Sequence, residues 1–272
     1  MRTLAPVSRS PAVIGQGDAA CSETLSQWIS STYRQQKTLA DAATAFSDAQ
    51  GALELTDFLL PSAFDAVARA LCVQTWRACG PPIVASYRIS HETGRLTDAP
   101  GAAPDALARL WALFTSSMFR DYLRAVTAGC GLTVGERVAG VVAAYAPGDY
   151  SLITDTEFLA KRKAEKLARR VGDKAVSKKA RATGASKGAG EDNDRDIAVL
   201  DVTLCIVRRE WDERVGGTMT YLTADEEVTS VVPRGNALSI ILRPPGVFRF
   251  TKYVSSDSPE TLFRVEMSFE VE

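Results

Sequence analysis

Near its C-terminus the chain reads Phe263-Arg264-Val265-Glu266-Met267-Ser268-Phe269-Glu270-Val271. Apolar and polar residues alternate without a break here, which is the period of two that a β-strand imposes on its side chains. One face of this strand is therefore apolar and suited to a core, and the other is either wet or turned towards a ligand. The stretch predicts one strand of a half-buried sheet.

Upstream of this strand the sequence consists of short apolar runs separated by turn residues. The turns contain Gly216-Gly217 and Pro244-Pro245-Gly246, and a need for positive φ explains the glycine pair. From Glu136 onward the pattern predicts strands at residues 138–145, 150–154, 197–207, 218–223, 227–232, 238–242, 247–254 and 263–271.

The first half of the chain shows the helical period of 3.6 residues instead. Helices are expected at residues 22–46, 62–79 and 104–126, with strands at 53–58 and 83–89. Trp76, Trp111 and Phe114 form a stripe that is typical of helices packing on a sheet. The expected fold class is α+β, a double-stranded β-helix (jelly roll) with helices packed on one sheet. We expect one domain at residues 23–272 after a disordered N-terminus at residues 1–22.

The composition is that of an ordinary soluble globular protein, with 46% hydrophobic and 24% charged residues and a net charge of −1 over 272 residues. Its single histidine, His91, excludes every metal site that takes two or more imidazoles from one chain, including the two-histidine iron sites of non-haem oxygenases. A Ser-His-Asp or Cys-His centre could use only His91, whose polar neighbours favour a solvated loop residue. The sequence therefore predicts no metal site.

The five cysteines are odd in number and include no C-x-x-C pair, which argues against disulfides and zinc and favours a reducing compartment. Cys72 and Cys79 are seven residues apart in an expected helix, so we interpret them as buried thiols on one face. No apolar run approaches the roughly 18 residues of a membrane span. We expect a cytoplasmic or nuclear protein. The alternative is a mitochondrial one, because the first 17 residues carry Arg2 and Arg9 and no acid.

A basic segment interrupts the strand-rich half. Residues 160–190 hold eleven Lys or Arg and two acids, a net charge of +9, and the rest of the chain has 21 bases and 31 acids. We interpret residues 160–195 as a flexible surface insertion; the alternative is a contact with RNA or the ribosome, because mobile cations neutralise phosphates. The segment has no aromatic residue to stack on bases, so we expect no sequence-specific reading and no DNA specificity. The candidate contact residues are Lys161, Arg162, Lys163, Lys166, Arg169, Arg170, Lys174, Lys178 and Lys179.

Several segments in a fixed order carry a resemblance to a known family. They are Trp28-Ile29-Ser30-Ser31-Thr32-Tyr33, Leu53-Glu54-Leu55-Thr56-Asp57-Phe58, Cys79-Gly80-Pro81-Pro82, Tyr145-Ala146-Pro147-Gly148-Asp149-Tyr150, Gly216-Gly217-Thr218, Asn236-Ala237-Leu238-Ser239 and Phe248-Arg249-Phe250-Thr251. The order and spacing of these segments resemble the Fe(II)/2-oxoglutarate-dependent prolyl hydroxylases of the Tpa/Ofd type. Such enzymes act on a prolyl residue of a small-subunit ribosomal protein, and the resemblance, over residues 25–272, is to their C-terminal double-stranded β-helix domain.

The resemblance also implies where a metal site would lie. The family's first iron-ligand pair falls on Thr154 and Thr156, and its second histidine falls on Arg249 by register or on Tyr253 by neighbourhood. Hydroxyls are poor ligands for Fe(II) and a guanidinium repels it, so these positions are degenerate. Arg264 falls where the family holds the 2-oxoglutarate carboxylate; its alternative is a cross-strand pair with Glu266 or Glu270.

We therefore expect a catalytically degenerate domain without cofactors that binds protein partners, in translation or in regulated protein stability. One alternative is an active peptidyl-prolyl hydroxylase that uses Fe(II) and 2-oxoglutarate, with Arg264 as the anchor. Another is an RNA- or ribosome-binding module that uses the basic insertion. Asp225-Glu226-Glu227 is either an acid/base cluster or, as we prefer, a solvated edge that blocks strand pairing.

Overall fold

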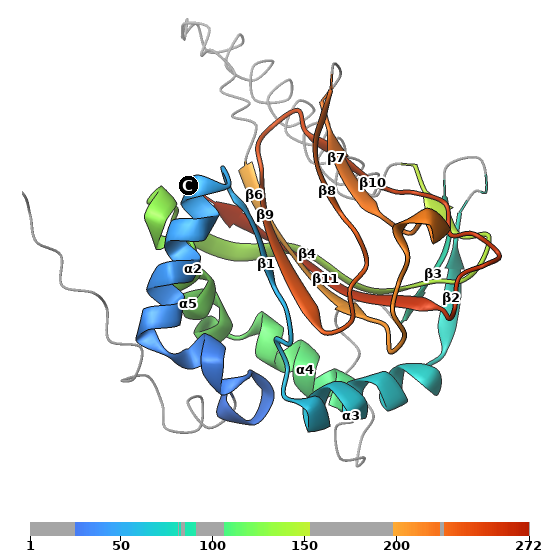
Figure 1. Ribbon diagram of the computed structural model, residues 1–272, viewed down its shortest axis with the longest axis horizontal. Helices are drawn as coiled ribbons and strands as arrows, with labels where there is room; N and C mark the ends of the chain where they lie inside the picture. The colour runs from blue at the N-terminus through green and yellow to red at the C-terminus, as the bar shows by residue number, and fades with distance from the viewer. Residues whose placement is uncertain are drawn as a thin grey trace, which may run out of the picture.

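The structure, a computed structural model, describes residues 25–80, 82, 85–90, 106–152, 198–223 and 226–271. The described helices come from the first half of the chain except for one short 3-10 helix, and the α-helices lie together on one side of the strands (Figure 1). They are η1 (Ser31–Arg34), α2 (Gln36–Asp48), α3 (Pro61–Cys72), α4 (Ala106–Thr115), α5 (Ser117–Val126), η2 (Ala128–Cys130) and η3 (Glu213–Val215). No helix in this described part of the chain is long and apolar enough to cross a bilayer.

The strands form one curled antiparallel sheet in the order β1-β9-β6-β11-β4-β3-β5-β10-β7-β8, with β2 paired to β3. Their bounds are β1 (Ala52–Leu55), β2 (Trp76–Cys79), β3 (Ala85–Ser90), β4 (Val134–Tyr145), β5 (Tyr150–Ser151), β6 (Ala198–Ile206), β7 (Met219–Leu222), β8 (Glu227–Val231), β9 (Ala237–Arg243), β10 (Phe248–Thr251) and β11 (Leu262–Val271). Curling brings the half that contains β5, β10, β7 and β8 over the half that contains β9, β6, β11 and β4 (Figure 1). This is the expected jelly roll with helices on one sheet.

The alternation along β11 divides the molecule into two interiors. Val265, Met267 and Phe269 point away from the curl and belong to the same core as residues of α3, α4 and α5. Arg264, Glu266 and Ser268 point into the curl and are only 2%, 3% and 5% exposed. The polar face of this strand is therefore enclosed by the second half of the sheet rather than wet.

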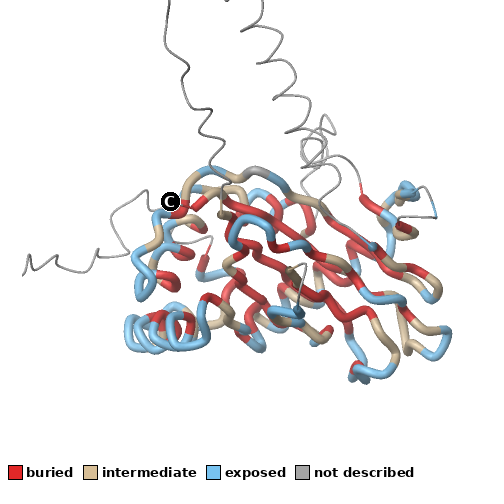
Figure 2. Tube along the Cα trace, turned by 90° about the horizontal axis from the view of Figure 1, so that it is seen from above, coloured by how far each residue is buried: buried red, intermediate tan, exposed pale blue. Residues whose placement is uncertain are grey.

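The helical layer is held to the sheet by aromatic residues as well as aliphatic ones. Phe114 of α4 and Phe119 of α5 stack with ring centroids 4.4 Å apart, and neither is exposed. Figure 2 shows the same pattern along the chain, with buried residues on the strands and exposed ones on the outer sides of the helices. Losing either ring costs about 3–5 kcal/mol of stability, the usual range for a buried phenylalanine.

Three expected helices differ from what the structure contains. The helix expected at 22–46 is interrupted, because Ile29 forms a β-bridge with Leu59 before η1 and α2 begin. The helix at 104–126 is two helices, since Ser116 caps α5 by accepting a hydrogen bond from the Phe119 amide at 3.2 Å. The prediction of a helix at 62–79 is wrong for its second half, because α3 ends at Cys72.

The residues after α3 form a strand instead. Trp76 begins β2, which pairs with β3, and its ring stacks on Phe263 of β11 at 5.4 Å, so it is not part of a helical stripe. Cys72 and Cys79 therefore do not share a helix face, and Cys72 is exposed rather than buried.

The turn before β7 explains its two glycines. Gly216 has φ +78° and Gly217 has φ +72°, and a Cβ on Gly216 would lie 1.8 Å from the Tyr253 carbonyl oxygen. The positive φ expected at this pair is confirmed, and close approach of the backbone is a second reason for glycine. The carbonyl of Gly216 accepts a hydrogen bond from Trp211 Nε1 at 2.9 Å.

Candidate functional site

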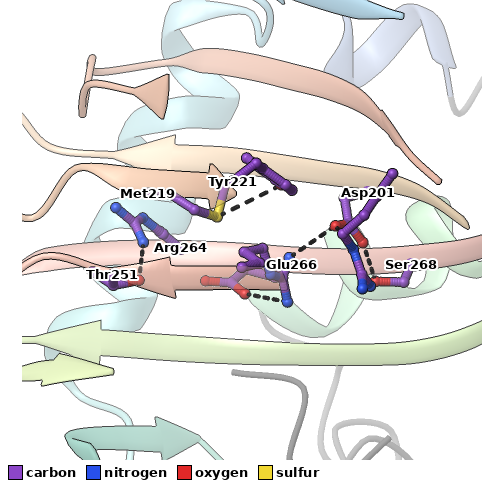
Figure 3. A network of polar contacts seen from close by, with 9 residues as sticks. Asp201, Met219, Tyr221, Thr251, Arg264, Glu266 and Ser268 are labelled. Carbon is purple, nitrogen blue, oxygen red and sulfur yellow. Dashed lines mark hydrogen bonds and ion pairs between the residues drawn. The ribbon is translucent and has the colours of Figure 1, made fainter. Parts of the chain in front are cut away.

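The inward face of the curled sheet carries a set of buried polar side chains. From β11 come Arg264, Glu266 and Ser268, and their direct partners on β6 are Cys205, Thr203 and Asp201. From the opposite half, β10 supplies Arg249 and Thr251, which pair with Tyr221 and Met219 of β7. Figure 3 shows Asp201, Glu266, Ser268 and Arg264 directed into the same interior.

Four of these side chains, Asp201, Arg243, Arg249 and Glu266, form what we call the interior ion network. Arg243 Nε donates a hydrogen bond to Asp201 Oδ2 at 2.8 Å, and Arg249 Nη1 lies 3.7 Å from the same oxygen. Arg249 Nη2 lies 3.4 Å from Glu266 Oε2. Two carboxylates and two guanidiniums are thus enclosed together, and their charges sum to zero.

Asp201 is the better stabilised of the two carboxylates. Besides its arginines it accepts a hydrogen bond from Ser268 Oγ at 2.5 Å. Burial by itself raises the pKa of Asp201, but the charges of Arg249 and Arg243 and the hydrogen bonds from Arg243 and Ser268 outweigh it, so the pKa lies below its ordinary value. Asp201 is therefore ionised at neutral pH.

Glu266 depends on Arg249. Within the described residues neither of its carboxylate oxygens accepts a hydrogen bond, and the one ion pair found for it is with Arg249. Its side chain is 3% exposed, so water compensates little of its charge. The stability of a charged Glu266 therefore rests on the guanidinium 3.4 Å away.

The third buried guanidinium, Arg264, lies apart from this network. Its Nη1 donates a hydrogen bond to Thr251 Oγ1 at 2.9 Å, its Nη2 donates to the Gly217 carbonyl, and its plane lies over the Tyr145 ring at 5.1 Å. Rather than pairing with Glu266 or Glu270, as one alternative predicted, it makes no ion pair with a carboxylate among the described residues. A buried guanidinium that is bound only to neutral groups can accept an anion.

Two side chains next to Arg264, Tyr145 and Cys205, are neutral. Burial raises the pKa of the Tyr145 phenol, and burial likewise raises the pKa of the Cys205 thiol to about 11. Both groups are therefore protonated at neutral pH, so neither supplies a negative charge to Arg264 or a thiolate ligand for a metal.

Among the described residues, the donor groups inside the curled sheet do not fit ferrous iron. The iron site of such oxygenases takes two imidazoles and one carboxylate, whereas the described part of this chain has no group of three His, Cys, Asp or Glu placed to hold a metal. His91, Thr154 and Thr156 lie outside the described residues. The interior carboxylates, Asp201 and Glu266, each already face a guanidinium.

The interior residues fit one carboxylate of 2-oxoglutarate better than they fit iron. The Arg264 guanidinium and the Thr251 hydroxyl, 2.9 Å apart, are groups that hold a carboxylate. The other end of 2-oxoglutarate is held by a metal in oxygenases, and that part of the site is the one that does not fit.

The structure brings some of the predicted site residues together and separates others. Arg249 and Arg264 both lie in the interior, whereas Tyr253 is 58% exposed and lies outside it. The candidate contacts from Lys161 to Lys179 lie outside the described residues. Asp201 and Arg243 were not predicted, although Asp201 lies on the same face of β6 as Thr203 and Cys205, and the rest of that strand is apolar.

The acidic cluster lies at an edge of the sheet. Glu227 begins β8, the last strand in the sheet order, and both Glu226 and Glu227 are exposed, whereas Asp225 lies outside the described residues. This position suits the preferred interpretation, in which charge at an edge strand discourages pairing with other chains.

The solved structures that are similar to this chain include two prolyl hydroxylases. A prolyl-4-hydroxylase from Pseudomonas putida is 15% identical with a TM-score of 0.49, over 85% of this chain and 98% of that chain. A prolyl hydroxylase from Trichoplax adhaerens, in complex with a peptide fragment of the hypoxia inducible factor oxygen degradation domain, is 9% identical with a TM-score of 0.51, over 87% and 91%. At 9% identity the likeness to the Trichoplax adhaerens protein concerns the fold alone.

Comparison of the sequence gives the family. No curated protein matches it. Residues 20–272 match the family model described as oxoglutarate and iron-dependent oxygenase degradation C-term. This match spans nearly the whole chain, and the jelly roll agrees with it. The chain therefore belongs to the C-terminal domain family of the oxoglutarate- and iron-dependent oxygenases that this description names.

Proposed function

We propose that this chain is a catalytically degenerate oxygenase-like domain that acts by binding a protein partner, in translation or in regulated protein stability. The observation that carries the first half of the proposal is the interior ion network. Arg249, at a position implied for an iron ligand, has a guanidinium within 4 Å of both interior carboxylates, at 3.7 Å from Asp201 and 3.4 Å from Glu266. A cation at this place repels a metal ion from both carboxylates.

Regulated stability is supported by the family itself. The word degradation is part of the description of the family to which residues 20–272 belong. A domain without its own chemistry influences the fate of another protein by holding it, so a protein partner is the simplest reading of that description.

The outer face of the curled sheet supports a binding role. Val228 of β8, Leu222 of β7 and Phe248 of β10 lie on neighbouring strands and on the face opposite to the buried Tyr221, and we call them the outer apolar strip. Val228 is 52% and Phe248 is 41% exposed. Adjoining exposed apolar side chains on neighbouring strands are a feature of protein interaction sites.

Metal binding and turnover test the loss of catalysis. The purified chain is loaded with Fe(II) under anaerobic conditions, its bound metal is measured, and succinate release from 2-oxoglutarate is followed after oxygen is admitted. We expect substoichiometric iron and succinate release no faster than in buffer. Stoichiometric iron together with succinate release that Arg264→Met abolishes would refute the proposal.

Partner binding is tested with the outer apolar strip. The tagged chain is isolated from cells of its source with and without nuclease treatment, and recovered proteins are quantified for wild type and for Val228→Ser/Phe248→Ser. The matched control is Val73→Ser, because Val73 is an exposed apolar residue, 82% exposed, beside a different element. We expect one nuclease-resistant partner that the double variant loses and the control keeps, and that binds the purified chain directly. Equal recovery with all three proteins would remove the strip from the proposal.

A second candidate function is favoured by Arg264. A buried guanidinium without a carboxylate partner among the described residues is what an active 2-oxoglutarate-dependent prolyl hydroxylase would retain. This candidate requires iron ligands from outside the described residues, and the turnover experiment above decides between the two candidates.

RNA or ribosome binding through Lys161–Lys179 stays a prediction. Deleting residues 160–190 and measuring ribosome association over a range of salt concentrations tests it, because phosphate contacts weaken steeply as salt rises. Association that is unchanged by the deletion and insensitive to salt would exclude it.

A further inference from the structure

The two carboxylates inside the curled sheet are compensated unequally. Asp201 has two arginines and a serine hydroxyl around it, whereas Glu266 has Arg249 alone among the described residues. Arg249 is also the residue that links the two carboxylates, at 3.7 and 3.4 Å. Removing Arg249 would therefore leave Asp201 compensated by Arg243 and leave Glu266 without a counter-charge.

We propose that the Arg249 guanidinium supplies, inside the curled sheet, the positive charge that a bound metal ion would otherwise supply. Its charge therefore prevents divalent cations from binding in the interior. The proposal deepens the proposed function and rests on it, since it explains why a degenerate barrel keeps two buried carboxylates. An enclosed carboxylate pair is costly unless a cation lies with it. In this chain the cation is covalently part of β10.

The two halves of the fold show why the cation matters. Arg249 comes from β10, whereas Asp201 and Glu266 come from β6 and β11 in the other half of the sheet. The ion pairs therefore hold the two halves of the curled sheet together across the interior. A metal ion bound by residues of both halves would do the same.

The proposal predicts that the interior becomes a divalent-cation site when Arg249 is shortened. Oxygen ligands favour Mg²⁺, Ca²⁺ and Mn²⁺, so these three ions are the probes. The melting temperature is measured in EDTA and over a range of each ion for wild type, Arg249→Ala, Arg249→Ala/Glu266→Gln and the surface control Arg234→Ala. Arg234 pairs with Glu54 at 2.7 Å but is 63% exposed, so its loss leaves no buried carboxylate.

We expect the ions to leave the melting temperature of the wild type unchanged, and likewise that of the surface control. We expect Arg249→Ala to melt lower in EDTA and to rise by at least about 4 °C when an ion is present about 100-fold above its dissociation constant. Titration calorimetry of Arg249→Ala with Mn²⁺ should give one site, and the double variant should lose it. A wild type that binds the ions as well as Arg249→Ala does, or an Arg249→Ala protein indifferent to all three, would overturn the proposal.

If Arg249→Ala folds neither in EDTA nor with the ions, a pair of milder variants decides. Arg249→Lys keeps a positive charge and Arg249→Gln does not. The proposal requires the lysine variant to melt well above the glutamine variant, and equal melting temperatures would overturn it. The wild-type turnover experiment is independent of these measurements, so a failure of the proposed function can be told apart from a failure of the inference about Arg249.

Discussion

The strongest quantitative prediction concerns the pair of Arg249 and Glu266. At their separation of 3.4 Å, two unit charges attract by about 5 kcal/mol at an effective dielectric constant of about 20. Part of this attraction offsets the cost of burying the guanidinium, which is several kcal/mol. We expect Arg249→Met to lower the free energy of unfolding by about 3–5 kcal/mol, because it leaves the Glu266 charge buried without a partner.

A double-mutant cycle separates this charge effect from lost packing. Glu266→Gln removes the carboxylate at nearly constant volume, so that Arg249 keeps its ion pair with Asp201 at 3.7 Å, and we expect a cost of about 1 kcal/mol. In the combined variant Arg249→Met/Glu266→Gln no carboxylate is stranded, because Asp201 retains Arg243 at 2.8 Å. The combined variant should therefore be more stable than Arg249→Met alone, with a coupling energy of about 2–3 kcal/mol.

The assay is urea denaturation at pH 7, followed by tryptophan fluorescence and far-ultraviolet circular dichroism. The control is Arg234→Met, which breaks the shorter but exposed pair with Glu54 and should cost no more than about 1 kcal/mol. Effects of the two single substitutions that add to within about 0.5 kcal/mol in the combined variant would refute the reasoning.

Three further predictions follow from the pKa values and the backbone. Because the pKa of Asp201 is lowered in the folded protein, its stabilising effect is complete above the unfolded pKa of about 3.9 and is lost as the pH falls below that value. Asp201→Asn should therefore be less stable than wild type at pH 7. Between about pH 4 and pH 2, thermal melts should show a smaller further loss of stability for Asp201→Asn than for wild type. Gly216→Ala should lose more than about 2 kcal/mol in the same urea assay or fail to fold, since its φ is +78° and the new Cβ would meet a carbonyl oxygen at 1.8 Å; unchanged stability would contradict the turn geometry. In native protein at pH 8 a thiol reagent should modify the exposed Cys72 and Cys130 within minutes and spare Cys205, whose buried thiol has a pKa of about 11, until denaturant is added, as peptide mass spectrometry would show.

Sequence periodicity predicted the sheet well where one strand carries a complete alternation. For β11 the period of two predicted which residues face the core, and only the enclosure of its polar face needed the structure. The period of 3.6 failed after Cys72, where the chain leaves the helix and Val73 is 82% exposed. Trp76 belongs to a strand because β2 pairs with β3. The local sequence period does not show whether a segment pairs with another strand.

The candidate site was predictable in part. The resemblance singled out Arg249 and Arg264, which the structure places in the interior, but it did not single out Asp201. The sequence of β6 is almost continuously apolar, and a single acid in it has no visible partner. Its partners, Arg243 and Ser268, lie 42 and 67 residues away in the sequence. Ion pairs and hydrogen bonds between residues so far apart are determined by the sheet order, which single-sequence patterns do not give.

The position of β11 in the sheet has a consequence for how the protein is made. Although it is the last strand in sequence, it lies between β6 and β4 and pairs with both along most of its length. Until β11 has left the ribosome, those two strands expose the edges that it will later fill, so the sheet can be completed only after β11 has emerged. We therefore expect nascent chains that stop before Leu262 to be chaperone clients and protease substrates, so that the emergence of β11 limits how much folded protein accumulates.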